Sequence, residues 1–461
     1  MFHGASIDRK QHSLHLQSRT QEHVSSRPWP SFHDSTCDID LLRKYGISDN
    51  GFLPAEAPLQ FLPDEYYLPW ELLIHNLPLL LKTDQLRTEI DSLDVLQTDN
   101  LRSEPEWRRA YVILAFLAQG YVWGGTEAAE VIPPCLSIPF LEISRKLELP
   151  PVLTYAASNL WNFTSTSGDF SDLDTLKTLH TFTGTQDEVW FFMVSVAMEA
   201  KAGCAIPAMC RAIEAKHNND YDIIEDALHK LRQCIEDVSR LLERMYEKND
   251  PSVFFNQIRP YLAGSKNMAE AGLPNGVFFD LGDGNGEWTQ LRGGSNGQSS
   301  LIQFFDISLG VNHTSEGNNT PHSPGSSPKA ATGPSFHEEV RDYMPGRHRR
   351  FLEHVQEMGS IREFVMQSRD TAEHQRIRDA YSLAVDALTD FRSKHIKLVT
   401  RYIILPSRQK SVAKKQNLAS ASSKHSGCDQ KLRGTGGTAL LPFLQQSRDE
   451  TSEAADLSIP S

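Results

Sequence analysis

His395 lies on the apolar stripe of a long amphipathic segment that runs from about Glu373 to Leu405. Apolar and aromatic residues recur three or four positions apart in that segment, as on the buried face of an α-helix. They are Tyr381, Val385, Leu388, Phe391, Val399 and Tyr402. A histidine on a buried face is more often a hydrogen-bonded core residue than a metal ligand. The spacing alone leaves both interpretations of His395 open.

Two glycine-rich segments have compositions that occur in ligand-binding loops. The string G-G-S-N-G-Q-S-S at 293–300 lacks the lysine and the preceding strand of a phosphate-binding loop. The string D-G-N-G-E at 283–287 lacks the twelve-residue ligand spacing of a calcium loop, so we expect a turn there. The six cysteines include no C-x-x-C pair. This pattern indicates neither a zinc knuckle nor a disulfide framework.

The charge balance argues against nucleic acid as the main partner. The 461 residues include 46 basic and 59 acidic side chains, for a formal net charge of −13, which favours solubility. The basic segment 406–438 is compatible with a nucleic-acid arm or a solvated surface loop, and its composition favours the loop. We find no run of the roughly 18 apolar residues that a membrane span needs. We therefore expect a cytoplasmic protein, with a mitochondrial presequence as the less favoured alternative.

Helical patterns dominate the chain from about Leu41 onward. Serine or threonine followed three residues later by glutamate marks the start of a helix, and this spacing occurs at Ser103, before a predicted helix over Glu104–Trp123, and at Thr185. A third amphipathic pattern covers Asp222–Lys248 and stops at a proline. Strand patterns bounded by turns are scarce. The predicted fold class is therefore all-α.

The composition also predicts a domain organisation. We expect a small N-terminal helical domain packed on a larger C-terminal helical domain that carries the histidine helix. The predicted parts are a disordered extension (1–34), the small domain (35–165), a connecting segment (166–184) and the large domain (185–461). Segments 312–335 and 406–438, rich in small and polar residues, are predicted to be mobile loops of the large domain.

Seven strings resemble the hallmarks of the indoleamine 2,3-dioxygenase family, in the order in which that family has them. The resemblance covers about Leu41 to Phe443, and the strings that carry it lie between residues 147 and 438. They are L-E-L-P-P-V-L-T-Y-A (147–156), F-F-M-V-S (191–195), F-F-N-Q-I-R-P-Y-L-A-G (254–264), G-G-S-N-G-Q-S-S (293–300), D-Y-M-P-G-R-H-R-R-F-L (342–352), F-R-S-K-H-I-K-L-V-T-R-Y-I (391–403) and G-T-G-G-T (434–438).

The resemblance implies one haem b per chain, with His395 as the iron ligand. One neutral imidazole can hold the iron and leave the opposite axial position open for dioxygen. Asp306 matches an acidic residue expected on the proximal side, where it would fix the imidazole tautomer directly or through water. Arg392 matches a basic residue expected near a haem propionate or Asp306. Gly294 would bring the backbone close to the haem or the indole.

The resemblance also implies a set of substrate-binding residues. Arg259 would bind the substrate carboxylate, because a guanidinium can hold a planar anion through two hydrogen bonds. Ser195 would be the one small polar group in a mostly apolar distal wall, and no side chain would act as acid or base. Thr435, in a loop that resembles a mobile lid, would reach the amino-acid end of the substrate. The remaining expected contacts are Tyr155, Phe191, Phe254, Leu262 and Ser295.

Four positions depart from the forms best known in the family. Asn159 stands where a small apolar residue is usual and Asn296 where alanine is usual, so both add polar bulk near the substrate or the haem edge. Ser158 stands where cysteine or serine occurs, and Ser265 where tryptophan commonly follows the L-x-G turn. Altered substrate scope would follow from the two asparagines.

The activity implied is cleavage of the indole C2–C3 bond of L-tryptophan by O2 to give N-formyl-L-kynurenine. This is the first step of the kynurenine pathway, which can lead to NAD biosynthesis. The implied partners are L-tryptophan, O2 and an electron donor that keeps the haem ferrous, with no nucleic acid and no membrane, and the implied state is a monomer. The alternative is a haem-binding sensor or a low-activity paralogue.

Overall fold

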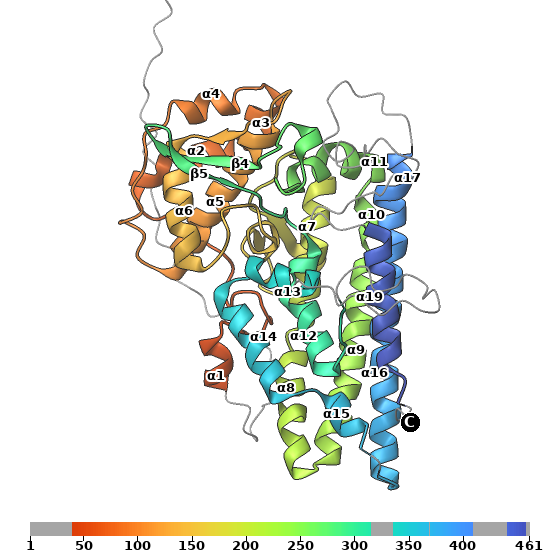
Figure 1. Cartoon of the computed structure of the whole chain (residues 1–461). Helices are drawn as coiled ribbons and strands as arrows, with labels where there is room; N and C mark the ends of the chain where they lie inside the picture. The colour runs from red at the N-terminus through yellow and green to blue at the C-terminus, as the bar shows by residue number, and fades with distance from the viewer. Residues whose placement is uncertain (1–38, 315–334, 368, 409–439, 458–461) are drawn as a thin grey trace, which may run out of the picture. The chain divides into compact units, whose positions relative to one another are not determined.

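Helices make up most of the regular structure of this chain (Figure 1). The computed structural model describes residues 39–314, 335–367, 369–408 and 440–457. The predicted all-α fold is confirmed, since the strands within these ranges are few and short. The predicted disordered extension at 1–34 and most of both predicted mobile loops lie outside the described residues.

The α-helices up to residue 253 are α1 (Ile39–Lys44), α2 (Leu68–His75), α3 (Leu77–Lys82), α4 (Leu86–Asp91), α5 (Glu104–Trp123), α6 (Pro134–Leu147), α7 (Gln186–Lys201), α8 (Ala205–Ala215), α9 (Tyr221–Glu243), α10 (Met245–Lys248) and α11 (Pro251–Val253). Those that follow are α12 (Ser300–Leu309), α13 (Phe336–Glu339), α14 (Gly346–Met358), α15 (Ile361–Val365), α16 (Ala372–Val399), α17 (Leu405–Ser407) and α19 (Leu440–Ala454). The strands are β1 (Val131–Ile132), β2 (Phe163–Ser165), β3 (Leu176–Thr178), β4 (Val277–Gly282) and β5 (Asn285–Thr289).

The predicted helix starts are confirmed by their capping hydrogen bonds. Ser103 accepts a hydrogen bond from the backbone N–H of Glu106 at the start of α5, and Thr185 accepts one from Glu188 at the start of α7. The Glu188 carboxylate accepts from the N–H groups of Phe182 and Thr183, at 2.9 and 2.8 Å. Glu188 therefore satisfies two N–H groups of the turn before α7 and fixes the position of the chain where it enters the helix.

The segment expected to be a turn is a complete β-hairpin. Asp283 and Gly284 have φ values of +54° and +74°, which suit the tight turn of a hairpin. Around them β4 and β5 pair antiparallel, and β1 adds to β4 in parallel. The turn was predicted correctly, but its flanking strands were missed, because their residues do not alternate clearly between apolar and polar types.

One helical run, Gln186–Asn218, is long and apolar enough to cross a membrane by composition. The search of the sequence for unbroken runs of apolar residues did not identify this segment. In its most apolar window 67% of the residues are buried inside the protein. This burial is typical of a core helix, so the run is weak evidence for a membrane span.

Two hydrophobic clusters meet along this helical run. Within this run the first cluster extends to Ala197 and the second starts at Ala202. The first also includes residues of α5 and α6, and the second includes residues of α8, α9 and α16. Residues Cys37–Ser461 form one compact unit by backbone proximity. The domain boundary at 166–184 therefore stays a prediction.

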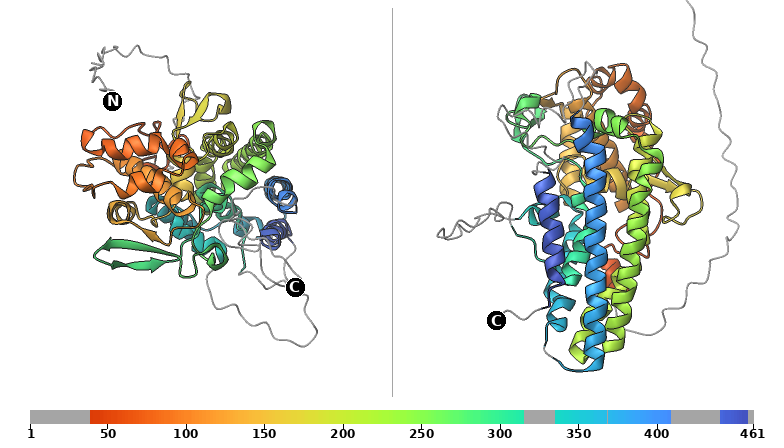
Figure 2. Two further views of the ribbon diagram at one scale, coloured as in Figure 1. Left: turned by 90° about the horizontal axis from the view of Figure 1, so that it is seen from above. Right: turned by 90° about the vertical axis from the view of Figure 1, so that its right-hand side faces the viewer.

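The long helix α16 packs against α9 and α19, as Figure 2 shows in its right-hand view. Its buried residues include Tyr381, Val385, Leu388 and Phe391, which confirms the predicted apolar stripe. The helix continues as a π-helical segment, η10 (Thr400–Ile404), and then α17. This packing determines where the side chain of His395 lies.

Candidate functional site

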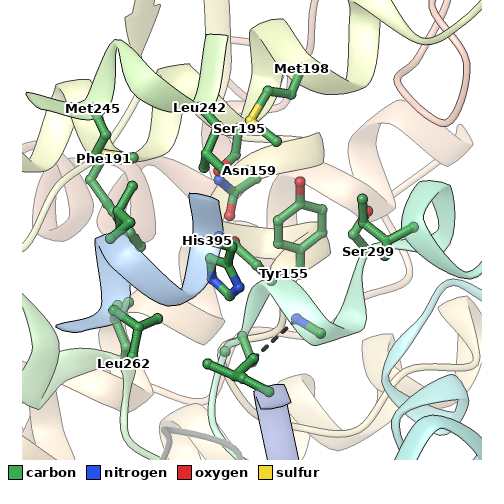
Figure 3. Close-up of a pocket in the computed structure, with 18 of the residues that line it drawn as sticks. Tyr155, Asn159, Phe191, Ser195, Met198, Leu242, Met245, Leu262, Ser299 and His395 are labelled. Atoms are coloured by element: carbon green, nitrogen blue, oxygen red, sulfur yellow. Dashed lines mark hydrogen bonds between the residues drawn. The ribbon is translucent and has the colours of Figure 1, made fainter. Parts of the chain in front are cut away.

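One cavity gathers nearly all of the residues that the sequence singled out (Figure 3). Its lining comes from segments far apart in the chain, including α7, α16 and α19. Two predicted site residues do not line the cavity. Asp306 accepts a hydrogen bond from Arg392, which does line it, and Thr435 lies outside the described residues. The predicted residues that line the cavity are Tyr155, Phe191, Ser195, Phe254, Arg259, Leu262, Gly294, Ser295, Arg392 and His395.

Three π-helical segments supply part of this lining. They are η2 (Ala156–Leu160), η5 (Phe254–Ile258) and η10. Each contributes at least one cavity residue, namely Asn159, Phe254 and Tyr402. A π-helical turn inserts an extra residue into a helix and so turns the following side chains toward a new direction, which is why such turns occur often at functional sites.

His395 points into the cavity among the lining residues labelled in Figure 3. Its ring makes no hydrogen bond with any other residue that the structure describes. Burial and the nearby charge of Arg392 lower the pKa of His395 to about 4. The imidazole is therefore neutral at physiological pH, and a lone pair is free to bind a metal.

Arg392 and Asp306 form a buried ion pair next to the histidine. Nη2 of Arg392 donates to Oδ1 and Oδ2 of Asp306 at 2.5 and 2.7 Å. Burial on its own would raise the pKa of Asp306, but Arg392 and His313 hold it well below its usual range. Nε of Arg392 is buried and has no hydrogen-bond partner among the described residues. This donor is suited to an anionic group of a ligand.

Aromatic and aliphatic side chains form most of the cavity wall. The rings of Phe191 and Phe254 lie 4.8 Å apart between centroids, and Tyr402 packs edge-on against Phe254 at 5.8 Å. Ser195, on α7, is buried within this wall. The wall of the cavity that contains His395 is therefore mostly apolar.

Arg259 is 2% exposed and lines the same cavity. It follows η5 directly, and Pro260 comes next, so the helix cannot continue regularly past this point. Burial lowers the pKa of Arg259 to about 10, which still leaves the guanidinium charged at physiological pH. A buried cation in a mostly apolar wall is suited to binding an anionic group.

The glycine-rich segment is held against the cavity by close backbone packing. A Cβ on Gly293 would lie 2.3 Å from the nitrogen of Gly264, and one on Gly294 would lie 3.1 Å from the oxygen of Leu153. Gln298 accepts from the N–H of Tyr155 at 2.9 Å and donates to the oxygen of Gly293 at 2.8 Å. The backbone at Gly294 therefore lies close to that of Leu153, and its approach to a haem or an indole stays a prediction.

The sequence did not reveal Glu199, a buried carboxyl group in the cavity wall. Its Oε1 accepts from Tyr155 at 2.9 Å and from Ser299 at 2.7 Å. Burial raises the pKa of Glu199 to about 7. Glu199 lies four residues after Ser195, and this helical spacing was the one signal that could have indicated it.

The sequence also did not indicate that α19 closes one side of the cavity. Residues of this helix line the cavity together with His337 of α13, and the rings of Phe443 and Phe336 lie 4.7 Å apart. The α19 residues in the lining are Leu440, Phe443, Leu444 and Ser447.

The four departures from the family pattern lie in different surroundings. Oδ1 of Asn159 accepts from Ser158 at 2.6 Å and Nδ2 donates to the oxygen of Phe192 at 3.2 Å, so the amide has a defined orientation in the cavity wall. Asn296 is half-buried in the lining. Ser265 bonds to Thr289 and Leu291 and is not among the lining residues.

The fold and the cavity define an all-α protein whose mainly apolar pocket contains a neutral imidazole that can bind a metal. Residues 41–454 match the indoleamine 2,3-dioxygenase family. The chain is 40% identical over 432 residues to an indoleamine 2,3-dioxygenase of Aspergillus nanangensis, covering 92% of this chain and 99% of the relative. It is also 40% identical over 442 residues to an indoleamine 2,3-dioxygenase of Saccharomyces cerevisiae, covering 91% and 94%. A 6-hydroxytryptophan 2,3-dioxygenase of Fusarium equiseti is 36% identical over 419 residues, covering 90% and 98%.

The chain belongs to the indoleamine 2,3-dioxygenase family. Members of this family are haem-dependent dioxygenases, so this protein is an oxidoreductase with haem as its cofactor. The cavity fits that group, because it combines a neutral imidazole, an apolar wall and the buried donor Nε of Arg392. These are the features that a haem, with its iron, macrocycle and propionates, needs from a protein.

The change Asp306→Asn should lower the free energy of unfolding by about 3 kcal/mol, because it leaves the buried charge of Arg392 without its counter-ion. Denaturant titration of the purified protein measures this quantity. The matched control is Asp342→Asn, at an exposed aspartate paired with Arg349, for which we expect a change of less than about 1 kcal/mol. Equal effects of the two changes would contradict a structural role for the buried pair.

Proposed function

We propose that this protein cleaves the C2–C3 bond of the indole ring of L-tryptophan, with both atoms of O2 entering the product N-formyl-L-kynurenine. The observation that carries the proposal is the neutral imidazole of His395 in a mainly apolar cavity that also holds the buried cation Arg259. The family supports the reaction class, and the cavity supports an apolar, anionic substrate.

His395 would hold the haem iron through one ring nitrogen. Nε of Arg392 would donate to a propionate, and Asp306 would neutralise the charge of Arg392 and fix its orientation. Bound ferrous haem supplies the activation of O2, which no amino-acid side chain provides. The contribution of the chain is to bind, to orient and to exclude water.

The substrate would lie between Arg259 and the aromatic part of the wall. The guanidinium would bind the carboxylate, while Phe191, Phe254 and Leu262 would pack against the indole. Ser195 would donate a hydrogen bond to the amine or to a bound water. Tyr155, Gly294 and Ser295 would complete the pocket, and Thr435 would contact the amino-acid end of the substrate. No side chain would act as acid or base.

The cellular setting is a further part of the proposal. A monomeric cytoplasmic enzyme would need an electron donor to keep the haem ferrous, and its product would enter the kynurenine pathway toward NAD biosynthesis. The excess of acidic over basic residues supports a protein without a nucleic-acid partner. The burial of the Gln186–Asn218 run supports a protein without a membrane span.

The change His395→Ala should abolish the haem absorption band and the formation of N-formyl-L-kynurenine, because it removes the proposed axial ligand. The ultraviolet-visible spectrum of purified, haem-reconstituted protein measures haem binding, and a tryptophan turnover assay measures the reaction. The control is His217→Ala, at an exposed histidine. A variant without His395 that keeps its haem band at full intensity would refute this assignment of the ligand.

The change Arg259→Ala should raise KM for L-tryptophan by roughly 10-fold to 100-fold, the scale of one charge-assisted hydrogen-bonded contact, with a smaller effect on kcat. Steady-state kinetics with L-tryptophan and with tryptamine, which lacks the carboxylate, separate the carboxylate contact from the rest. We expect the variant to lose its preference for tryptophan over tryptamine. An unchanged preference would contradict carboxylate binding by Arg259.

A second candidate substrate class is ring-hydroxylated tryptophan. The buried amide of Asn159 in the cavity wall favours it, and one relative is named a 6-hydroxytryptophan 2,3-dioxygenase. The change Asn159→Val should lower kcat/KM for 6-hydroxytryptophan relative to tryptophan by roughly 10-fold if the amide bonds the ring hydroxyl. Equal kcat/KM ratios in the two proteins would exclude this role. Haem-loaded protein that turns over neither substrate would support a sensor or low-activity paralogue instead.

A further inference from the structure

A buried chain of charged groups extends from Arg392 to the C-terminal helix. Asp306 of α12 accepts from Arg392 of α16, and its Oδ2 lies 3.1 Å from Nε2 of His313. Nδ1 of His313 lies 2.7 Å from Oε2 of Glu450 on α19. The side chains of Asp306, His313 and Glu450 are 6, 7 and 10% exposed. We call these four residues the Glu450–Arg392 network.

The network requires a proton on each ring nitrogen of His313. Carboxylates only accept hydrogen bonds, so an imidazole between two of them bonds to both only as the imidazolium. The two positive groups, Arg392 and His313, then balance the two carboxylates. Burial on its own lowers the pKa of His313, but Asp306 and Glu450 raise it above its ordinary value.

The other groups that face His313 are compatible with this charge. The ring of His337, on α13, stacks on that of His313 with centroids 3.9 Å apart and an angle of 15° between their planes. Burial and the charge of His313 lower the pKa of His337 to about 3, so His337 stays neutral. Thr314 donates to the other oxygen of Glu450 at 3.0 Å through its N–H, which further stabilises the ionised carboxylate.

A metal ion is the competing occupant, because Asp306, His313 and His337 have potential ligand atoms within 4.8 Å of one another. Two observations favour the proton. The nearly parallel imidazole rings direct their in-plane lone pairs alongside one another, whereas ligands of one metal must converge on it. Both oxygens of Asp306 also accept hydrogen bonds from Arg392, whose charge would repel a divalent cation.

The network attaches α19 to the helix that bears His395. Glu450 lies two turns after Phe443 on α19. Phe443 and Leu444 form part of the cavity wall. Arg392 is one turn before His395 on α16. The position of the α19 wall therefore depends on an ion pair whose other end lies beside the proposed iron ligand.

We propose that protonated His313 is a positioning residue, which anchors α19 against the cavity through Glu450 and Asp306. A group whose pKa is raised by folding contributes stability that is complete below its unfolded pKa of 6.5 and is lost as pH rises through the folded value. The anchor should therefore hold at pH 6.5 and weaken at alkaline pH. The proposal does not depend on which indole substrate the enzyme uses.

Hydrogen–deuterium exchange of the haem-loaded protein tests the anchor. The readout is the protection factor of peptides from α19, corrected for the intrinsic effect of pH. Between about pH 6 and pH 9 the native protein should lose protection in α19 by roughly 10-fold, the scale of one charge-assisted hydrogen bond. His313→Asn and Glu450→Gln should show that loss already at the lowest pH and little further dependence on pH.

Matched controls are His217→Asn and Glu453→Gln, which make the same chemical changes at exposed positions, the second on α19 itself. They should behave as the native protein. Protection in α19 that is independent of pH in the native protein, or equal effects of Glu450→Gln and Glu453→Gln, would overturn the proposal. Protection that rises on adding Zn²⁺ and falls with EDTA, only while His313 is present, would overturn it in favour of a metal site.

Discussion

A neutral imidazole in a mainly apolar cavity is the feature on which the rest of this site depends. An imidazole can bind iron only through an unprotonated nitrogen, and burial of His395 together with the charge of Arg392 favours that form. A buried arginine in turn needs a counter-ion, which Asp306 supplies. Arg392 and Asp306 therefore form one electrostatic unit beside the neutral imidazole, and neither of these two charges could be buried alone at low cost.

The second requirement is that distant segments meet around this unit. The packing of α16 between α9 and α19 directs His395 inward, and π-helical turns at η2, η5 and η10 turn further side chains toward the same space. A regular α-helix would place those side chains about 100° away from their present direction at each inserted residue. The irregular turns thus give the cavity its shape, whereas the regular helices give it rigidity.

Local signals predicted much of the fold. Capping at Ser103 and Thr185 and the stripe that contains His395 depend on residues within a few turns of one another, so they can be recognised from spacing alone. The family resemblance then indicated a set of site residues, and those that the structure describes line one cavity, except Asp306, which bonds to the lining residue Arg392. Their roles toward haem and substrate stay predictions.

Other features could not be predicted, because they depend on tertiary contacts. From the sequence alone Glu199 is an ordinary helical glutamate. Only the structure shows that Tyr155 and Ser299 donate hydrogen bonds to it. The bond between His313 and Glu450 joins residues 137 positions apart. The strands β4 and β5 have no clear apolar alternation, and only their pairing makes them a hairpin. Each of these cases needs information on which segments become neighbours.

The role of His395 as the ligand of the haem iron is tested most directly by rescue of a variant that lacks this side chain. His395→Gly, reconstituted with haem and reduced, should lack the resonance Raman iron–histidine stretching band, and added imidazole should restore the band by filling the space of the lost side chain. A variant that shows the native band without imidazole would contradict the account, because another residue would then be the ligand.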